Sequence, residues 1–192
     1  QDTAVLLVTH EPEEAMRMTY IENHDSNAWE GTMAENYGDA LYAMTGLSFA
    51  GEGLPLIHNG LEACNAKRLE FFEKDAIDWS QGRGCIYGRL LEQLIEFCKS
   101  KPALDNGQWG ARMQKVENSA PEQLLSWVRQ KDGNKVLGLF KMSDRPVSAT
   151  LTSRLPVGTY AESPLRREVT IAEDETIELT AWGWRLFASG SE

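Results

Sequence analysis

The sequence predicts an α/β region followed by an all-β region. Between residues 18 and 100, short apolar runs alternate with segments of helical periodicity. This order of strand, helix, strand and helix implies parallel strands joined by crossover helices. From about residue 105 onward the helical periodicity stops, and short β-type runs follow one another between turns, which favours an antiparallel β-sandwich. We therefore expect two domains, residues 1–104 and residues 105–192.

The opening segment predicts a strand or a buried helical segment over residues 4–9, followed by a helix. Pro12 suits the first position of that helix, and Glu13 and Glu14 suit its positively polarised N-terminus. The next apolar and β-branched run, residues 18–21, predicts a strand.

Three further elements are expected before residue 101. Residues 34–50 predict a mostly buried helix, and the short apolar run 54–58, bounded by glycines, predicts a strand covered on both faces. After a long irregular connection, residues 86–100 predict an amphipathic helix. Its apolar side chains at helical spacing are Leu90, Leu91, Leu94, Ile95 and Cys98.

The second region contains eight short β-type runs. Asp132 and Gly133, within "QKDGNK", give the signal of a tight hairpin between the second and third runs. The eight runs cover residues 112–117, 124–130, 135–142, 148–152, 158–162, 168–171, 176–180 and 184–188.

Composition and charge exclude several kinds of partner. The chain has 192 residues and a formal net charge of −10, from 29 acidic and 19 basic side chains. It has no basic stripe that could release counterions from a polyanion, so we expect neither nucleic acid nor an anionic membrane surface as a partner. No run reaches the roughly 18 apolar residues that indicate a membrane span. The first residues carry no targeting signal, so the sequence assigns no compartment.

Cysteine and histidine spacing gives no sign of a metal site or a cofactor. Cys64, Cys85 and Cys98 are odd in number and contain no C-x-x-C pair, so we expect structural free thiols rather than a disulfide framework. The histidines lie at no recognised ligand spacing.

A polar triplet, Asn23, His24 and Asp25, follows the strand predicted at residues 18–21. Taken by itself, it fits a hydrogen-bonded pair that merely ends a strand, and it also fits part of an active site. The residue types alone do not decide between these two interpretations.

Five segments in register resemble the last third of α-amylase-type enzymes of glycoside hydrolase family thirteen. They are "MTYIENHDSNAWEGT", "GLPLIHNGLE", "KRLEFFEKDAIDW", "LLEQLIEFCKSKPAL" and "VRQKDGNKVLGLFKMSD". The resemblance implies that the chain holds the last two βα units of a catalytic (β/α)₈ barrel, followed by a C-terminal β-sandwich. It also implies that the triplet lies at the C-terminal end of a barrel strand, where such barrels keep their chemistry.

The resemblance gives each residue of the triplet a role. Asp25 would stabilise the transition state of a retaining hydrolase that cleaves α-1,4-glucosidic bonds, and His24 and Asn23 would bind the sugar. The family's nucleophile and general acid come from earlier strands, whose motifs are absent from these 192 residues. We therefore expect a fragment that is inactive alone.

The chain also departs from the family pattern near the triplet. Leu61 stands where the family commonly has Gln, and His58 occupies a place where an aromatic residue is more usual. Glu22 adds a carboxylate beside the triplet. We expect Glu22 and Glu62 to be structural or solvated carboxylates, and we give His58 no catalytic role.

The resemblance implies an α-glucan or a maltooligosaccharide as the partner. The alternative is a non-catalytic carbohydrate-binding or oligomerisation module, and the open edges of barrel strands predict a homo-oligomer. We expect Phe71, Phe72 and Trp79 to pack a long loop against the barrel, with a sugar-stacking surface as the less favoured use. The sandwich or interdomain core is the expected place of Trp109, Trp127, Trp182 and Trp184.

Overall fold

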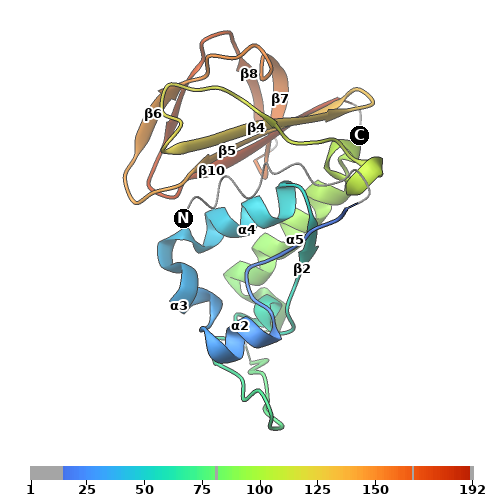
Figure 1. Cartoon of the computed structure of the whole chain (residues 1–192), viewed down its shortest axis with the longest axis vertical. Coiled ribbons are helices and arrows are strands. Elements are labelled where there is room, and N and C mark those ends of the chain that lie inside the picture. Colours follow the sequence, from blue (N-terminus) through green and yellow to red (C-terminus); the bar gives the residue numbers. More distant parts are fainter. Residues whose placement is uncertain (1–14, 81, 166, 191–192) are drawn as a thin grey trace.

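The computed structural model describes residues 15–80, 82–165 and 167–190. The strand predicted over residues 4–9 and the helix predicted to begin at Pro12 lie outside the described residues. The helices and two short strands occupy one end of the molecule, and the remaining strands form the other end (Figure 1). No helix in the described part of the chain is long and apolar enough to cross a membrane.

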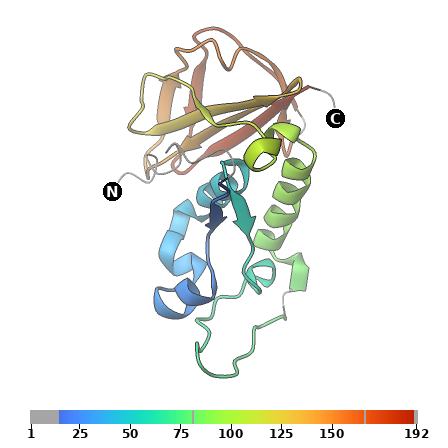
Figure 2. The ribbon, with the colours of Figure 1, turned by 45° about the vertical axis from the view of Figure 1, so that its right-hand side comes forward.

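The first part of the described chain contains two short strands and four α-helices. Strand β1 pairs in parallel with β2, Met18 lying opposite Leu54, and the two strands run side by side in Figure 2. The predicted order and the parallel pairing are therefore confirmed. The elements are β1 (Met18–Tyr20), α2 (His24–Trp29), α3 (Met33–Tyr37), α4 (Leu41–Ala50), β2 (Leu54–Leu56) and α5 (Ile86–Lys99).

The helix predicted over residues 34–50 is divided in two. A 3₁₀ turn, Gly38–Ala40, separates α3 from α4. Gly38 ends α3 with φ of 47° and ψ of −127°, a backbone conformation that glycine adopts readily because it has no Cβ. The predicted burial is confirmed for α4, where seven of ten residues are buried.

The strand at residues 54–58 was expected to be covered on both faces, and this expectation is wrong for the described residues. Leu54 is 42% exposed and Ile57 is 38% exposed. The physical reason is that, within the part of the chain that the structure describes, β2 pairs with β1 alone. The two strands therefore leave apolar side chains and backbone edges uncovered.

The second part of the described chain is all β, and each of the eight predicted runs contains a strand. The larger sheet has six antiparallel strands in the order β3-β4-β5-β10-β7-β8, and the smaller sheet pairs β6 with β9. The strands are β3 (Gln114–Lys115), β4 (Leu124–Lys131), β5 (Asn134–Lys141), β6 (Val147–Thr150), β7 (Gly158–Ser163), β8 (Arg167–Ile171), β9 (Thr176–Leu179) and β10 (Trp184–Ser189).

The predicted hairpin between β4 and β5 is confirmed. Lys131 pairs with Asn134, which leaves a two-residue loop of Asp132 and Gly133. Their φ angles are 51° and 81°, and two positive φ angles give the loop the twist that matches the strands on either side.

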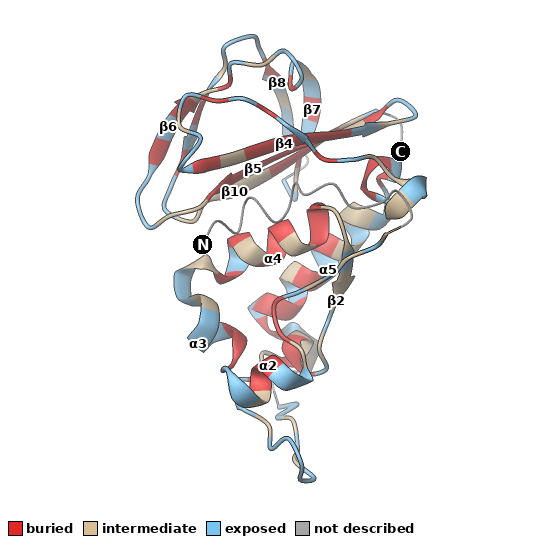
Figure 3. Ribbon diagram, in the orientation of Figure 1, coloured by how far each residue is buried: buried red, intermediate tan, exposed pale blue. Residues whose placement is uncertain are grey.

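Both faces of the large sheet are buried at its central strands, β4 and β5, whereas the edge strands β3 and β8 are largely exposed (Figure 3). One face packs on α4 and α5 in a core that includes Leu47, Leu94 and Trp127. The opposite face packs on the smaller sheet in a second core that includes Leu137 and Ile177. The first core therefore joins the helical part of the chain to the β part.

Arg129 reinforces this junction from strand β4. The side chain is only 2% exposed, and its guanidinium donates to the carbonyl oxygens of Ala111 (2.8 Å), Gly51 (2.7 Å) and Asp105 (2.8 Å). Desolvation lowers the pKa of Arg129 to about 10, so the group still carries its charge at neutral pH. The buried cation connects the end of α4, the segment after α5 and the large sheet.

The expectation of three free thiols is wrong for two of them. Cys64 and Cys85 form a disulfide, whereas Cys98 is free. The two bonded cysteines lie 21 residues apart in the chain, at the two ends of the long irregular connection. That connection folds back on itself, and this brings the cysteines together, which spacing along the chain does not reveal.

Candidate functional site

The candidate site begins where β1 turns into α2. Asn23 caps this short helix, its side-chain oxygen accepting a hydrogen bond from the backbone N–H of Ser26 (2.8 Å). The hydroxyl of Ser26 in turn accepts from the backbone N–H of Asn23 (2.9 Å). This reciprocal capping box fixes the start of the helix. The side chain of Asn23 thus stabilises the N-terminus of α2, in addition to any contact with a ligand.

His24 and Asp25 occupy the first turn of α2 and face solvent. Their side chains are 74% and 58% exposed, and the His24 Nε2 atom lies 3.5 Å from the Asp25 Oδ1 atom. Because β1 and β2 are parallel, the triplet lies at the same edge as His58, which follows β2. The structure therefore gathers Asn23, His24 and Asp25 at the C-terminal end of a strand, with the imidazole and carboxylate accessible.

An exposed group of aromatic rings adjoins His24. The ring of Phe71 stacks on the imidazole of His24, with centroids 5.9 Å apart and planes inclined by 18°. Phe71 also contacts Trp29 and Phe72, at centroid distances of 5.4 and 4.8 Å. Phe72 is 80% exposed and Trp29 is 63% exposed. The expected packing of Phe72 against a barrel is therefore wrong, since its ring faces solvent.

Asn27 holds the loop that carries these phenylalanines. Its side chain is fully buried. The Oδ1 atom accepts from the backbone N–H of Leu69 (2.8 Å), and the Nδ2 atom donates to the carbonyl oxygen of Lys67 (3.3 Å). This loop extends beyond α2 at the end of the molecule opposite the large sheet (Figure 2). Asn27 thus positions Phe71 against His24, a role that the sequence did not reveal.

A salt bridge between Arg68 and Glu35 adds a second attachment of the same loop. The Arg68 Nε atom lies 2.9 Å from the Glu35 Oε2 atom. The hydrogen bond from Arg68, followed by one from the backbone of Thr32, lowers the pKa of Glu35 to about 2. Both side chains are about half exposed, so solvent screens the pair and the buried amide of Asn27 is the stronger attachment.

Glu22 is a buried structural carboxylate, as expected. It is 2% exposed. The Oε2 atom accepts from the backbone N–H of Met33 (2.9 Å), and the Oε1 atom lies 3.0 Å from the Nδ1 atom of His58. The pair joins the end of β1 to the end of β2 behind the triplet. Glu62 accepts a hydrogen bond from the backbone N–H of Gly60 (2.9 Å), which also suits a structural role.

The tryptophans of the second part divide between core and surface. Trp127 is fully buried, and Trp184 packs against the first core. Trp109 is 58% exposed, so its expected place in a core is wrong. It lies in a 3₁₀ turn, Gly107–Trp109, ahead of the first strand of the large sheet. Among the described residues, no group of three or more His, Cys, Asp or Glu side chains is arranged to hold a metal ion.

Comparisons with known proteins give the fold. No family model and no curated protein matches this sequence. The structure is similar to an α-amylase from Lactobacillus plantarum, with a TM-score of 0.70 and 18% identity over 98% of this chain and 42% of that one. For a maltogenic α-amylase from Thermotoga neapolitana, the TM-score is 0.63 at 19% identity, over 93% of this chain and 40% of that one.

A third solved structure, AmyP in complex with maltose, gives a TM-score of 0.67 at 12% identity, covering 92% of this chain and 41% of that one. The chain thus spans about two fifths of the length of the structures that it matches. It has the fold of part of an α-amylase, which confirms the architecture expected from the resemblance at this level.

Proposed function

We propose that this chain belongs to glycoside hydrolase family thirteen and forms the C-terminal part of a retaining α-glucan hydrolase. Residues 1–104 would supply the last two βα units of the (β/α)₈ barrel, and residues 105–192 the C-terminal β-sandwich. The observation that carries the proposal is the fold, which matches α-amylases over almost the whole chain. The Asn-His-Asp triplet supports it, because the triplet follows β1 at its C-terminal end, where such barrels keep their chemistry.

In this proposal His24 and Asp25 grip the sugar at the cleavage point. An oxocarbenium-like transition state flattens the ring, and hydrogen bonds to its hydroxyl groups strengthen as it does so. An exposed carboxylate beside an exposed imidazole offers acceptors and a donor for two such hydroxyls. Asn23 contributes chiefly by capping α2, because its side-chain oxygen is already engaged with Ser26.

The chain alone would not hydrolyse starch. Retaining hydrolysis needs a nucleophile and an acid that protonates the leaving oxygen, and one stabilising carboxylate replaces neither. Incubating the purified chain with soluble starch and measuring reducing ends tests this expectation, with Asp25→Asn as the control. Sustained turnover above that of Asp25→Asn would contradict the proposed inactivity.

A hybrid enzyme tests the proposed roles directly. The 192 residues replace the matching part of the Lactobacillus plantarum α-amylase, which then supplies its own earlier strands. We expect Asp25→Asn to lower kcat by about 10² to 10³, the cost of losing one preorganised transition-state contact, with a smaller change in KM. An active hybrid whose kcat and KM are unchanged by Asp25→Asn and by His24→Ala would refute the proposed roles of these two residues.

The alternative function is a non-catalytic carbohydrate-binding module, and the exposure of Trp109 favours it. Trp109 is 58% exposed, so its flat ring could stack on a sugar face, whereas the fully buried Trp127 could not. Calorimetry with maltoheptaose tests this alternative. If Trp109 stacks on the glucan, Trp109→Ala abolishes binding; if the triplet alone contacts the glucan, Trp109→Ala leaves binding unchanged.

Self-association is a further part of the proposal. The side chains of Met18, Tyr20 and Leu54 on β1 and β2 are 52%, 40% and 42% exposed, and strands with open edges and apolar faces tend to pair. We expect a dimer or a larger homo-oligomer in solution. Light scattering measures the mass, and a clean monomer at micromolar concentration would contradict this expectation.

A further inference from the structure

Two side chains next to the triplet contact each other although they lie 36 residues apart in the chain. The Glu22 Oε1 atom lies 3.0 Å from the Nδ1 atom of His58. Strands β1 and β2 pair in parallel with Tyr20 opposite Leu56. Two residues beyond this pair, at the C-terminal ends of the strands, Glu22 and His58 therefore lie side by side. They are two of the residues at which the chain departs from the family pattern.

The pair is buried, whereas the site beside it is exposed. The side chains of Glu22 and His58 are 2% and 15% exposed, and those of His24 and Asp25 are 74% and 58% exposed. A buried carboxylate is costly unless its oxygens are hydrogen-bonded. Both oxygens of Glu22 meet this condition, because Oε1 faces His58 and Oε2 accepts from the backbone N–H of Met33 (2.9 Å).

Helix α2 depends on such contacts for its position. It has six residues, too few for a helix to be stable alone. Glu22 directly precedes Asn23, the N-cap of the helix. The Glu22 carboxylate holds this point to the end of β2 through His58 and to the first residue of α3, Met33. A shift of Glu22 would therefore move the backbone that presents Asp25.

The same hydrogen bond determines which nitrogen of the imidazole carries a proton. An ionised carboxylate only accepts hydrogen bonds, so the Nδ1 atom of His58 donates to Glu22. A carboxylate in this position fixes both the protonated nitrogen and the orientation of the ring. His58 thus supplies a donor of defined direction, which an aromatic hydrocarbon ring at the same place could not.

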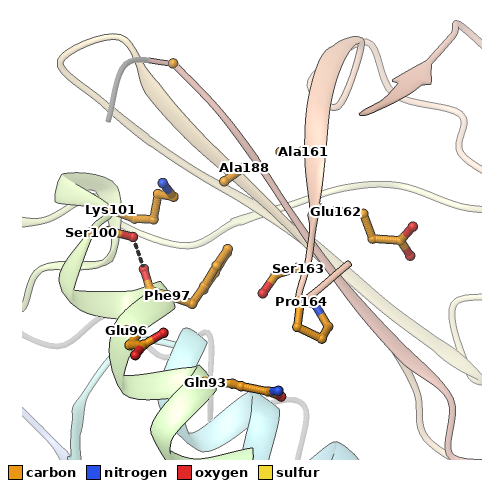
Figure 4. Close-up of a pocket in the computed structure, with 11 residues that line it drawn as sticks. Gln93, Glu96, Phe97, Ser100, Lys101, Ala161, Glu162, Ser163, Pro164 and Ala188 are labelled. Carbon is orange, nitrogen blue, oxygen red and sulfur yellow. Dashed lines mark hydrogen bonds between the residues drawn. The ribbon is translucent and has the colours of Figure 1, made fainter. Parts of the chain in front are cut away.

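We propose that Glu22 and His58 are positioning residues, whose hydrogen bond joins the ends of β1 and β2 and so holds Asp25 in the place from which it contacts the sugar. That contact of Asp25 rests on the proposed function, whereas the pair rests on its own geometry. Neither member of the pair touches the substrate. The pair is also separate from the groove between α5 and the large sheet, whose lining includes Phe97 and Pro164 (Figure 4).

Long-range ¹H–¹⁵N NMR of the full chain, labelled in histidine, tests the hydrogen bond. We expect the Nδ1 atom of His58 to carry a proton. Glu22→Gln keeps an acceptor for the Met33 N–H but turns an amide donor toward Nδ1, which should then be bare. The matched control is Glu62→Gln, because Glu62 bonds to the backbone N–H of Gly60 instead; it should leave Nδ1 protonated. A bare Nδ1 in the wild-type chain would overturn the proposal.

Two substitutions of His58 separate positioning from simple packing. His58→Asn keeps an N–H donor near the place of Nδ1, whereas His58→Phe keeps a ring and removes the donor. The readout is hydrogen exchange at the Asn27 amide, which donates to the carbonyl oxygen of Asn23 in the first turn of α2 (3.0 Å). We expect exchange about tenfold faster in His58→Phe and within about threefold of wild type in His58→Asn, as for the loss or retention of one charge-assisted hydrogen bond. The reverse order would show that only the ring matters and would overturn the proposal.

The hybrid enzyme carries the same comparison to the reaction. We expect kcat to fall about tenfold in His58→Phe, with a smaller change in KM, because Asp25 is then misplaced in the transition state. His58→Asn should stay near the wild-type kcat. Glu22→Gln combined with His58→Phe should lose no more than His58→Phe alone, since both changes remove one hydrogen bond. Losses that simply multiply would contradict a shared role.

The outcomes also distinguish this proposal from the proposed function. A hybrid that loses activity with Asp25→Asn but not with His58→Phe would refute the positioning role and leave the proposed function standing. A hybrid unchanged by Asp25→Asn, in a chain where Nδ1 is protonated and exchange at Asn27 responds to His58→Phe, would refute the catalytic role of Asp25. It would support the pair as the anchor of α2.

Discussion

Replacing Asn27 by alanine should release the loop that carries Phe71. The substitution removes two hydrogen bonds, from the backbone N–H of Leu69 (2.8 Å) and to the carbonyl oxygen of Lys67 (3.3 Å). At about 1 kcal/mol for each bond, the attached state of the loop loses about 2 kcal/mol relative to the detached state. Detachment then becomes roughly 30-fold more frequent. The Arg68–Glu35 pair remains, but an exposed pair is too weak to compensate.

Hydrogen exchange at the Leu69 amide measures this detachment. We expect exchange about 30-fold faster in Asn27→Ala, with weaker NOEs between Phe71 and His24. The control is Asn36→Ala, because the Asn36 amide donates to the carbonyl oxygen of Gly31 (2.9 Å) and makes no hydrogen bond to the loop. Exchange at Leu69 within threefold of wild type, or equally fast in the control, would refute Asn27 as the anchor.

Three other predictions concern the whole fold. Arg129→Met removes the donor of four carbonyl oxygens, of which those of Ala50 and Gly51 are in buried hydrogen bonds. It should lower the free energy of unfolding by about 3 kcal/mol, seen as a lower urea midpoint at constant m-value. Reducing the Cys64–Cys85 disulfide reopens a loop of 21 residues and should cost about 3 kcal/mol; an unchanged Tm in dithiothreitol would contradict this. Burial raises the pKa of the Cys98 thiol from 9.0 to about 12. Burial is also the largest cause that raises the pKa of Tyr87, from 10.0 to about 12. Both groups therefore stabilise the fold fully below about pH 9 and lose that contribution as the pH rises to 12, so Cys98→Ala should flatten the alkaline decline of stability.

The parts of the fold that the sequence predicted depend on local signals. Asp132 and Gly133 specify their own turn, because the hairpin needs positive φ angles at two adjacent positions. Likewise α5 follows from apolar residues at helical spacing, and the eight β-type runs follow from their length and turns. The break at Gly38 was missed because a glycine inside a helical pattern can be tolerated as easily as it can end the helix.

The features that the sequence did not reveal are pairings between distant residues. Cys64 bonds to a cysteine 21 residues away, and Asn27 bonds to a backbone group 42 residues away. Arg129 did leave a usable signal. It lies two residues after Trp127 in β4, so both side chains point to the same face of the sheet, and a buried Trp127 implies that Arg129 needs buried acceptors.

The candidate site combines both kinds of information. The position of the triplet after a strand was predicted, but the start of α2 was not, because the capping box between Asn23 and Ser26 that presents His24 and Asp25 was not recognised in the sequence. The stacking of Phe71 on His24 could not be predicted from the sequence, since it depends on the loop between the two bonded cysteines and on Asn27. Phe71 already occupies one face of the imidazole, so a sugar must reach His24 from its edge or its other face. The loop therefore determines how the triplet can be approached, although no residue of the triplet encodes it.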